Sequence, residues 1–155
     1  MSIRVLVVDD FEMFRQFVRS MLSDNPEIEV VAEAVDGCEA VQKARQLQPD
    51  LLVLDIGLPK QSGIEAARQI RQMAAPPKIL FLTENTSPAI VREALNTGAM
   101  GYVVKSDAGR ELQPAVEAVV EGKRFVSRRL EGLGFSLDQT GSTSCAPSLS
   151  QTMLV

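Results

Sequence analysis

Short apolar segments that alternate with longer segments of helical period constrain the fold of this chain more than any other feature. Four of them are almost continuously apolar, which is typical of parallel strands buried on both faces. A fifth alternates between apolar and polar residues and predicts a strand with one wetter face, as at a sheet edge. The four continuous segments are 3–8, 51–54, 78–82 and 101–104, and the alternating one is 27–35.

The segments between these strands carry apolar residues three or four positions apart, the spacing of a helix with one buried face. Gly98 and Gly122 stand where two of these helices end, because a helix C-terminus favours a residue at positive φ. Pro114 conflicts with the last helix: it either lies in the first turn, which tolerates proline, or kinks the helix. The predicted helices lie within 11–22, 38–47, 63–73, 88–98 and 108–122.

Strand and helix thus alternate five times, a pattern that predicts βαβ units with right-handed crossovers. We expect an α/β fold, with a doubly wound, five-stranded parallel sheet and helices on both of its faces. A chain of 155 residues is about one ordinary domain. Residues 1–131 are predicted to form it. Residues 132–155 are rich in Ser and Thr and have no period, which predicts a flexible tail or a truncated linker.

The composition excludes several classes of function. The chain has no histidine, which removes Ser-His and Cys-His triads and imidazole zinc sites. Its formal net charge is −4, whereas surfaces that bind nucleic acid usually carry a basic excess. Cys38 and Cys145 lack metal-binding spacing and are expected to be reduced thiols. No apolar segment approaches the roughly 20 residues of a membrane span, so we expect a cytoplasmic protein without a membrane partner.

Polar side chains follow the strands at the point where each strand ends. Asp9 and Asp10 follow the first strand, Asp55 the third, Thr83 the fourth and Lys105 the fifth. The carboxyl ends of parallel strands meet at one edge of a sheet, where ligands bind in open α/β folds. Two carboxylates about 4 Å apart repel by about 4 kcal/mol at an effective dielectric of 20. The sequence therefore predicts a site that must also hold a cation.

Oxygen ligands without imidazole or thiolate favour a hard ion, and Mg²⁺ characteristically takes one or two carboxylates together with waters and phosphate oxygens. Asp9, Asp10 and Asp55 suit this ion. A carboxylate can also attack a phosphoryl group when cations neutralise the incoming charge. Asp55, with Mg²⁺ on one side and Lys105 on the other, is therefore a candidate phosphoryl acceptor.

Four motifs in this order and spacing resemble a known family. Together they are similar to the receiver domain of bacterial two-component response regulators, in particular of the subfamily that usually carries a C-terminal helix-turn-helix. The resemblance covers residues 3 to about 130 and implies a flavodoxin-like sheet of order 2-1-3-4-5. The motifs are "VLVVDD" (5–10), "LLVLDIGLPKQSG" (51–63), "LFLTEN" (80–85) and "GAMGYVVKS" (98–106).

Carried over by position, the resemblance assigns a metal site and a phosphoryl acceptor. Asp9 and Asp10 correspond to the acidic pair that binds Mg²⁺. Asp55 corresponds to the phosphoacceptor, which also contacts the metal. Gly57 corresponds to the residue that offers the metal its backbone carbonyl, so the lack of a side chain costs no ligand.

The resemblance also assigns a switch. Thr83 corresponds to the hydroxyl that moves to bond the phosphoryl oxygens, Lys105 to the cationic clamp, and Tyr102 to an aromatic residue whose rotamer is coupled to the hydroxyl. Glu84 and Asn85 occupy positions that tune the phosphoryl group. The family often has a small or apolar residue at the position of Glu84, so its charge is expected to slow phosphorylation by small anionic donors.

The function implied by the resemblance is a phosphorylation-dependent signalling switch rather than an enzyme acting on a separate substrate. A sensor histidine kinase or phosphotransfer protein would donate to Asp55, and the domain would assist its own Mg²⁺-dependent dephosphorylation. The output would be dimerisation or partner docking through the fourth helix, fifth strand and fifth helix, roughly 87–121. DNA would be contacted only through an output domain, which "GKRFVSRRL" (122–130) precedes in relatives and which is missing from this sequence.

Each site residue also has an ordinary structural interpretation. Asp10 could be a helix N-cap, Asp55 a turn residue before Gly and Pro, and Lys105 a solvated lysine. Thr83 could satisfy a strand end or cap the next helix. Tyr102 could be a packed aromatic residue with its hydroxyl in water.

Two other functions are open at this point. The first is a constitutive interaction module that is not phosphorylated in use, which Glu84 and the missing output domain favour. The second is a Mg²⁺-dependent phosphohydrolase, which needs a second acid where Gly57 stands. The basic residues Lys123, Arg124, Arg128 and Arg129 could contact phosphates, but such a cluster is more often a solvated face.

Overall fold

A computed structural model describes residues 2–133 of the chain. The predicted tail therefore lies outside the described residues, apart from 132 and 133. These two end a 3₁₀ helix, η2 (Arg128–Leu133), that continues past the predicted boundary at 131. Across residues 2–133, every helix is too short or too polar to cross a lipid bilayer.

The centre of the molecule is one parallel sheet with the order β2-β1-β3-β4-β5-β6. This order confirms the predicted doubly wound topology. It also adds a sixth, two-residue strand beyond the predicted fifth, so that β5 is not the edge of the sheet. The strands are β1 (Ile3–Val8), β2 (Ile28–Ala34), β3 (Leu51–Leu54), β4 (Lys78–Thr83), β5 (Gly101–Val104) and β6 (Phe125–Val126).

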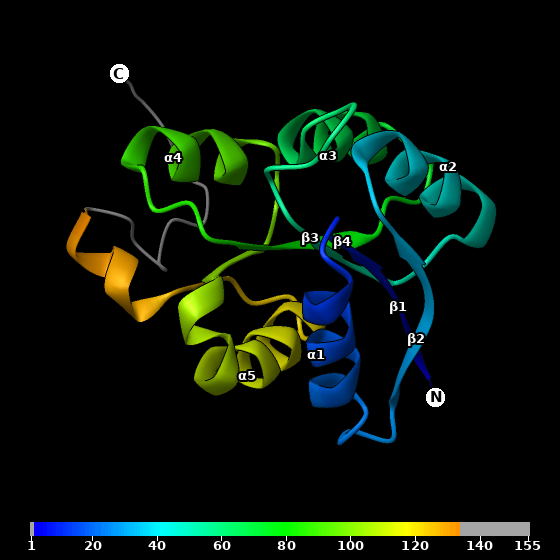
Figure 1. Cartoon of the computed structure of the whole chain (residues 1–155), viewed down its shortest axis with the longest axis horizontal. Coiled ribbons are helices and arrows are strands. Elements are labelled where there is room, and N and C mark those ends of the chain that lie inside the picture. Colours follow the sequence, from blue (N-terminus) through cyan, green and yellow to red (C-terminus); the bar gives the residue numbers. More distant parts are fainter. Residues whose placement is uncertain (1, 134–155) are drawn as a thin grey trace.

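Helices cover both faces of the sheet, as predicted (Figure 1). The helices α1 and α5 lie on one face, and α2, α3 and α4 lie on the other. A short 3₁₀ helix, η1 (Lys105–Asp107), joins β5 to α5. The helices are α1 (Glu12–Leu22), α2 (Gly37–Leu47), α3 (Gly63–Arg71), α4 (Pro88–Asn96) and α5 (Ala108–Val120).

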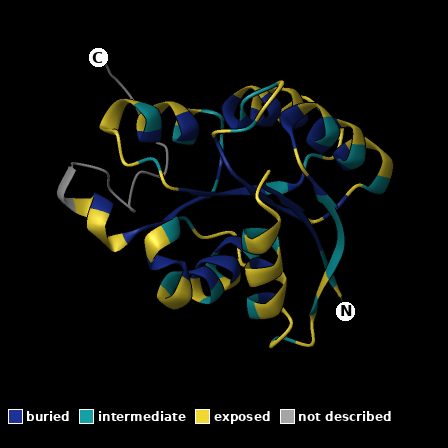
Figure 2. Cartoon of the chain, viewed as in Figure 1, coloured by how far each residue is buried: buried dark blue, intermediate teal, exposed yellow. Residues whose placement is uncertain are grey.

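The central strands are buried on both sides because successive side chains point into two different cores. In β1, Leu6 and Val8 join the core under α2, α3 and α4, whereas Val5 and Val7 join the core under α1 and α5. Figure 2 shows the strands as the most continuously buried part of the chain. In contrast, β2 is mostly half-buried, which confirms that the alternating segment forms a sheet edge.

The helix ends follow the sequence signals closely. Gly98 and Gly122 have φ of 97° and 86°, the left-handed values expected where these helices end. Pro114 lies inside α5, well beyond its first turn, so the alternative of a first-turn proline is wrong. The apolar stripe predicted for the first helix is buried only in part: Val18 and Leu22 are buried, whereas Phe11 is 61% exposed.

The first residue of α3 packs against the backbone that carries Asp55. A Cβ added at Gly63 would lie 1.9 Å from the carbonyl oxygen of Asp55, and the Gly63 amide donates a hydrogen bond to the carbonyl of Ile56. The loop after β3 can therefore fold back on the strand end only if this position lacks a side chain. Glycine at position 63 therefore allows α3 to begin directly against the backbone of Asp55.

Replacing Gly63 by alanine is expected to lower the free energy of unfolding by about 1–3 kcal/mol, because backbone must move to admit the methyl group. Gly109→Ala is the matched control. The added methyl group meets no other atom of the described chain within 4 Å, and in a helix it should raise stability by roughly 0.4–1 kcal/mol. Urea unfolding of both variants measures the difference. Equal stabilities would contradict the close packing at Gly63.

Candidate functional site

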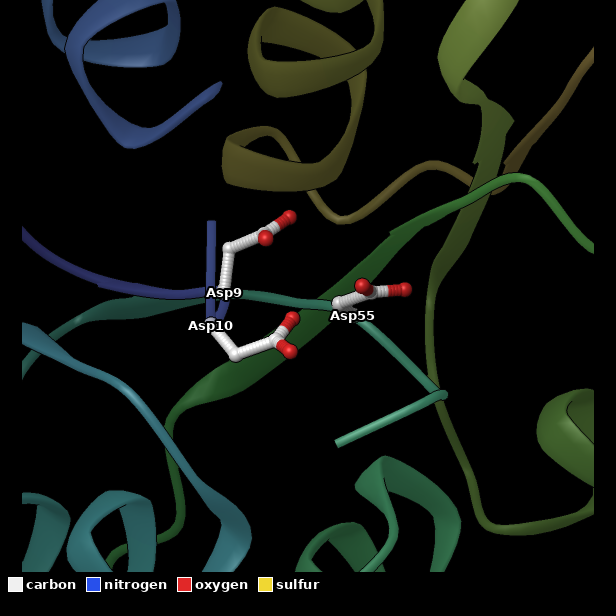
Figure 3. Close-up of side chains that lie close together, drawn as sticks. All are labelled: Asp9, Asp10 and Asp55. Atoms are coloured by element: carbon white, nitrogen blue, oxygen red, sulfur yellow. The ribbon is translucent and has the colours of Figure 1, made fainter. Parts of the chain in front are cut away.

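Three carboxylates meet at the carboxyl edge of the sheet (Figure 3). Val8 pairs with Leu54 across β1 and β3, so the residues that follow these strands are neighbours. Oxygens of Asp9, Asp10 and Asp55 lie within 4.8 Å of one another. Asp9 and Asp55 are buried and Asp10 is exposed. The sequence-predicted acidic cluster is thus assembled by the strand register.

Backbone hydrogen bonds fix two of these carboxylates. The amide of Phe11 donates to Asp9 Oδ1 at 2.9 Å, and the amide of Ile56 donates to Asp55 Oδ1 at 2.7 Å. The N-cap residue of α1 is Phe11, so the interpretation of Asp10 as a helix N-cap is wrong. The Asp10 side chain points toward the other two carboxylates instead (Figure 3).

Lys105 bridges the two buried carboxylates. Its Nζ lies 2.7 Å from Asp9 Oδ2 and 3.1 Å from Asp55 Oδ2. The same nitrogen lies 4.6 Å from the centroid of the Phe14 ring, within the range of a cation–π interaction. Its side chain is only 12% exposed, so the interpretation as an ordinary solvated lysine is wrong.

Burial and charge oppose each other at this bridge. Burial disfavours the ammonium of Lys105, but the hydrogen bond that it donates to Asp9 and the charges of Asp55 and Asp9 outweigh this effect and raise the pKa of Lys105. Burial raises the pKa of Asp9, and the hydrogen bond with Lys105 opposes that rise without cancelling it. The pocket therefore strongly favours a cation.

Thr83 and Tyr102 lie on neighbouring strands beside the carboxylates. Thr83 is buried, and its Oγ1 accepts a long hydrogen bond of 3.4 Å from the Asn85 amide. Tyr102 is fully buried, and its hydroxyl donates to the carbonyl of Asn85 at 2.8 Å. The interpretation of Tyr102 as a packed aromatic residue with its hydroxyl in water is therefore wrong. The next helix, α4, has Ser87 as its N-cap, so Thr83 does not cap it.

Tyr102 is also sensitive to the charge of the site. Burial raises the pKa of its phenol, and the charge of Asp55 raises it further. The ring packs against Phe81, with centroids 6.2 Å apart. Through the carbonyl of Asn85, the tyrosine contacts the loop that follows β4.

The remaining predicted positions lie in the loops that follow β3 and β4. Gly57 is exposed in the loop that follows Asp55, whereas Asn85 is half-buried in the loop after β4. Glu84 is exposed and lines a hollow of about 490 Å³ beside Lys105, together with Phe11 and other residues. Glu84 and Lys105 therefore line the same hollow.

The structure adds contacts that the sequence analysis missed. The ring of Phe14 under Lys105 belongs to the apolar stripe of α1, and its spacing gave no sign of a cation above it. The basic cluster is only partly a solvated face, since Arg129 forms an ion pair of 2.6 Å with the buried Asp107. Lys123, in contrast, is 73% exposed and pairs with Glu121 at 3.4 Å.

Three carboxylates with oxygens this close form an all-oxygen donor set, and the lack of histidine in the chain leaves no imidazole ligand. Such a set suits a hard divalent cation such as Mg²⁺. The residues therefore fit the metal that the sequence predicts, and the buried ammonium of Lys105 provides a positive charge beside Asp9 and Asp55.

The comparisons with known proteins agree on one kind of domain. Residues 5–117 match the family model described as the response regulator receiver domain. The crystal structure of a LuxR-family two-component response regulator from Aurantimonas sp. SI85-9A1 superposes with a TM-score of 0.81 at 38% sequence identity, over 85% of this chain and 94% of that one.

Two curated relatives are longer than this chain. The transcriptional regulatory protein DegU of Brevibacillus brevis is 36% identical over 125 residues, which are 81% of this chain and 53% of the relative. Protein-glutamate methylesterase/protein-glutamine glutaminase 5 of Geobacter metallireducens is 36% identical over 150 residues, 96% of this chain and 40% of the relative. The chain thus spans about half the length of these relatives or less.

The Lys105 bridge makes a prediction about stability and pH in metal-free buffer. Lys105→Met removes the attraction that opposes the raised pKa of Asp9, so this pKa rises further above its usual 3.8. A group with a raised folded-state pKa contributes stability that is complete below the unfolded value and is lost as the pH rises through the folded pKa. The variant should therefore lose stability relative to the wild type between pH 4 and pH 7.

At pH 7 the loss should be on the order of 3 kcal/mol, because removal of one partner leaves buried charge unpaired. Thermal unfolding of both proteins in the presence of a chelator, at several pH values, measures the gap. A gap that is the same at pH 4 and pH 7 would mean that the lysine stabilises the fold by packing alone.

Proposed function

Because the chain belongs to the family of response regulator receiver domains, we propose that it is a signalling switch that accepts a phosphoryl group on Asp55. The donor is a sensor histidine kinase or a phosphotransfer protein in the cytoplasm. The observation that carries the proposal is the place of Asp55: a buried carboxylate at the end of β3, beside two further carboxylates and 3.1 Å from the Lys105 ammonium.

Mg²⁺ would be held by the carboxylates of Asp9, Asp10 and Asp55 and by the backbone carbonyl of Gly57. When bound, the ion neutralises charge on the phosphoryl oxygens and on the carboxylates around them. The backbone hydrogen bonds that fix the carboxylates of Asp9 and Asp55 support this assignment.

The acceptor chemistry belongs to the chain's own side chains. A carboxylate oxygen of Asp55 attacks the phosphorus of the phosphohistidine, the N–P bond breaks, and the donor imidazole leaves with its electron pair and takes up a proton. Asp55 then carries an acyl phosphate, and the ammonium of Lys105 balances the charge of the transferred group. Attack of water on phosphorus later releases inorganic phosphate and restores the carboxylate.

Thr83 and Tyr102 convert this chemistry into a change of shape. Thr83 ends β4, the strand next to β3, and its hydroxyl would turn to donate to a phosphoryl oxygen. Its present contact, the 3.4 Å bond from the Asn85 amide, is weak enough to give up. Asn85 and Tyr102 would follow, which shifts the population of the loop after β4.

The output is dimerisation or docking of a partner on the face formed by α4, β5 and α5. The predicted five-stranded sheet would leave one edge of β5 open on this face. In the structure, β6 pairs with β5 and covers that edge. Contact with DNA would require an output domain in addition to the receiver. The domain assists its own phosphorylation and dephosphorylation and acts on no separate substrate.

The acceptor role predicts a covalent adduct. Incubation with Mg²⁺ and phosphoramidate should add one phosphoryl group to the wild type, visible in the intact mass. Asp55→Ala should remain unmodified, and a chelator should reduce the modification of the wild type by at least tenfold. Equal modification of Asp55→Ala would move the acceptor to another residue, and an unmodified wild type would favour a constitutive interaction module.

Glu84 is proposed to slow reaction with small anionic donors because its carboxylate lines the hollow beside Lys105 and repels an incoming anion. Glu84→Ala should raise the rate with phosphoramidate roughly two- to tenfold, since charges a few ångströms apart at a surface interact by about 0.5–1.5 kcal/mol. Glu117→Ala, which removes an exposed charge from α5, is the control and should leave the rate unchanged. Equal rates for all three proteins would rule out an electrostatic gate.

A further inference from the structure

The segment after α5 returns along the free edge of β5. The chain turns at Gly122, which has a φ of 86°, and Phe125 and Val126 then pair with Gly101 and Tyr102. At the left of Figure 1, η2 is drawn in orange and follows β6, the strand that ends the sheet. The segment after α5 therefore borders β5, the strand that ends immediately before Lys105.

Ser127 continues the hydrogen bonds of this pairing beyond the end of β6. Its amide donates to the carbonyl of Tyr102 at 2.8 Å. Its side-chain Oγ accepts from the amide of Val104 at 2.8 Å and donates to a carboxylate oxygen of Glu111. Ser127 is fully buried, so its hydroxyl satisfies a backbone amide that would otherwise carry a desolvation cost. That amide belongs to the residue immediately before Lys105.

A second anchor holds the other end of the turn that carries Lys105. The guanidinium of Arg129 donates two hydrogen bonds, of 2.6 and 2.9 Å, to the carboxylate of Asp107. Asp107 is the last residue of η1 and is buried. The bond from Arg129 is the main reason why the pKa of Asp107 is lowered. A bidentate pair of this kind fixes direction as well as distance.

Leu130 completes the attachment by hydrophobic packing. It is 1% exposed and lies in the same core cluster as Tyr102 and Val104. Its amide also donates to the carbonyl of Ser127 at 2.9 Å. The segment is thus bound by core packing, by a backbone ladder and by two polar anchors that flank Lys105.

We propose that Ser127 and Arg129 are positioning residues that hold Lys105 at the two carboxylates by fixing both ends of the turn that carries it. The proposal rests on the proposed acceptor site and adds a regulator to it: the chain after α5. Detachment of this segment from β5 would let Lys105 move away from the two carboxylates and would lower the affinity of the site for a phosphoryl group.

Thermodynamic linkage makes the coupling between docking of this segment and binding at Asp55 reciprocal. If the docked segment strengthens binding at Asp55, binding at Asp55 must tighten the docking of the segment by the same factor. A protein or domain attached after residue 133 could thus both sense the phosphoryl group and change its affinity. The same coupling would not exist if the segment were only a structural cover for the sheet edge.

The test uses beryllofluoride with Mg²⁺ as the probe of the phosphoryl site, and titration calorimetry measures its Kd. Ser127→Ala and Arg129→Ala should each raise the Kd about fivefold or more, the usual size of such a coupling. Lys123→Ala is the matched control, because it removes a basic residue of the same segment that pairs with Glu121 away from this turn. It should leave the Kd within about twofold.

Amide exchange in the wild type gives an independent readout. Saturation with beryllofluoride should slow exchange at Val104 and Ser127, whereas the amide of Asn25, in the turn after α1, should not change. This measurement needs no variant, so it decides the matter even if Ser127→Ala fails to fold. Melting temperatures that fall while the Kd stays constant would overturn the proposal, as would unchanged exchange.

The two levels of the proposal fail in different ways. A wild type that binds no beryllofluoride would overturn the acceptor site itself. A wild type that binds, together with variants of equal Kd, would leave the acceptor site intact and overturn only the role of Ser127 and Arg129.

Discussion

The bridge from Lys105 to Asp9 and Asp55 is the interaction on which the rest of the site depends. Buried carboxylates that face each other cannot both remain ionised without a cation between them. The parallel sheet brings the three residues together, because β1, β3 and β5 all end at the same edge. The charge balance that results, with one buried ammonium against three carboxylates, favours a further cation at the site.

The fold could be predicted because its strongest signals are local. Short apolar segments such as "LLVL", which alternate with segments of helical period, indicated a buried parallel sheet. The four motifs correctly predicted that the chain is a receiver domain. The strand β6 could not be predicted, because two residues have no period and their pairing depends on β5, more than twenty residues earlier. For the same reason, nothing in the sequence indicated the role of Ser127, because the contacts of its hydroxyl with Val104 and Glu111 form only in the folded chain.

At the site, residue types predicted the chemistry but not the contacts. The order of strand ends was enough to bring Asp9, Asp55 and Lys105 together. The interpretation of Asp10 as an N-cap failed because α1 begins one residue later, with Asp9 as the acceptor for the Phe11 amide. The hydroxyl of Tyr102 turned inward because the carbonyl of Asn85 offers a buried partner, which no local pattern reveals.

The central claim, that Asp55 carries the phosphoryl group, is tested most directly by locating the acyl phosphate. Reduction of the phosphorylated protein with borohydride converts a phosphorylated aspartate to homoserine, and peptide mass spectrometry then identifies its position. The account predicts homoserine at position 55 and unchanged aspartate at positions 9 and 10. Homoserine at another position, or at none after phosphorylation has been verified by intact mass, would contradict it.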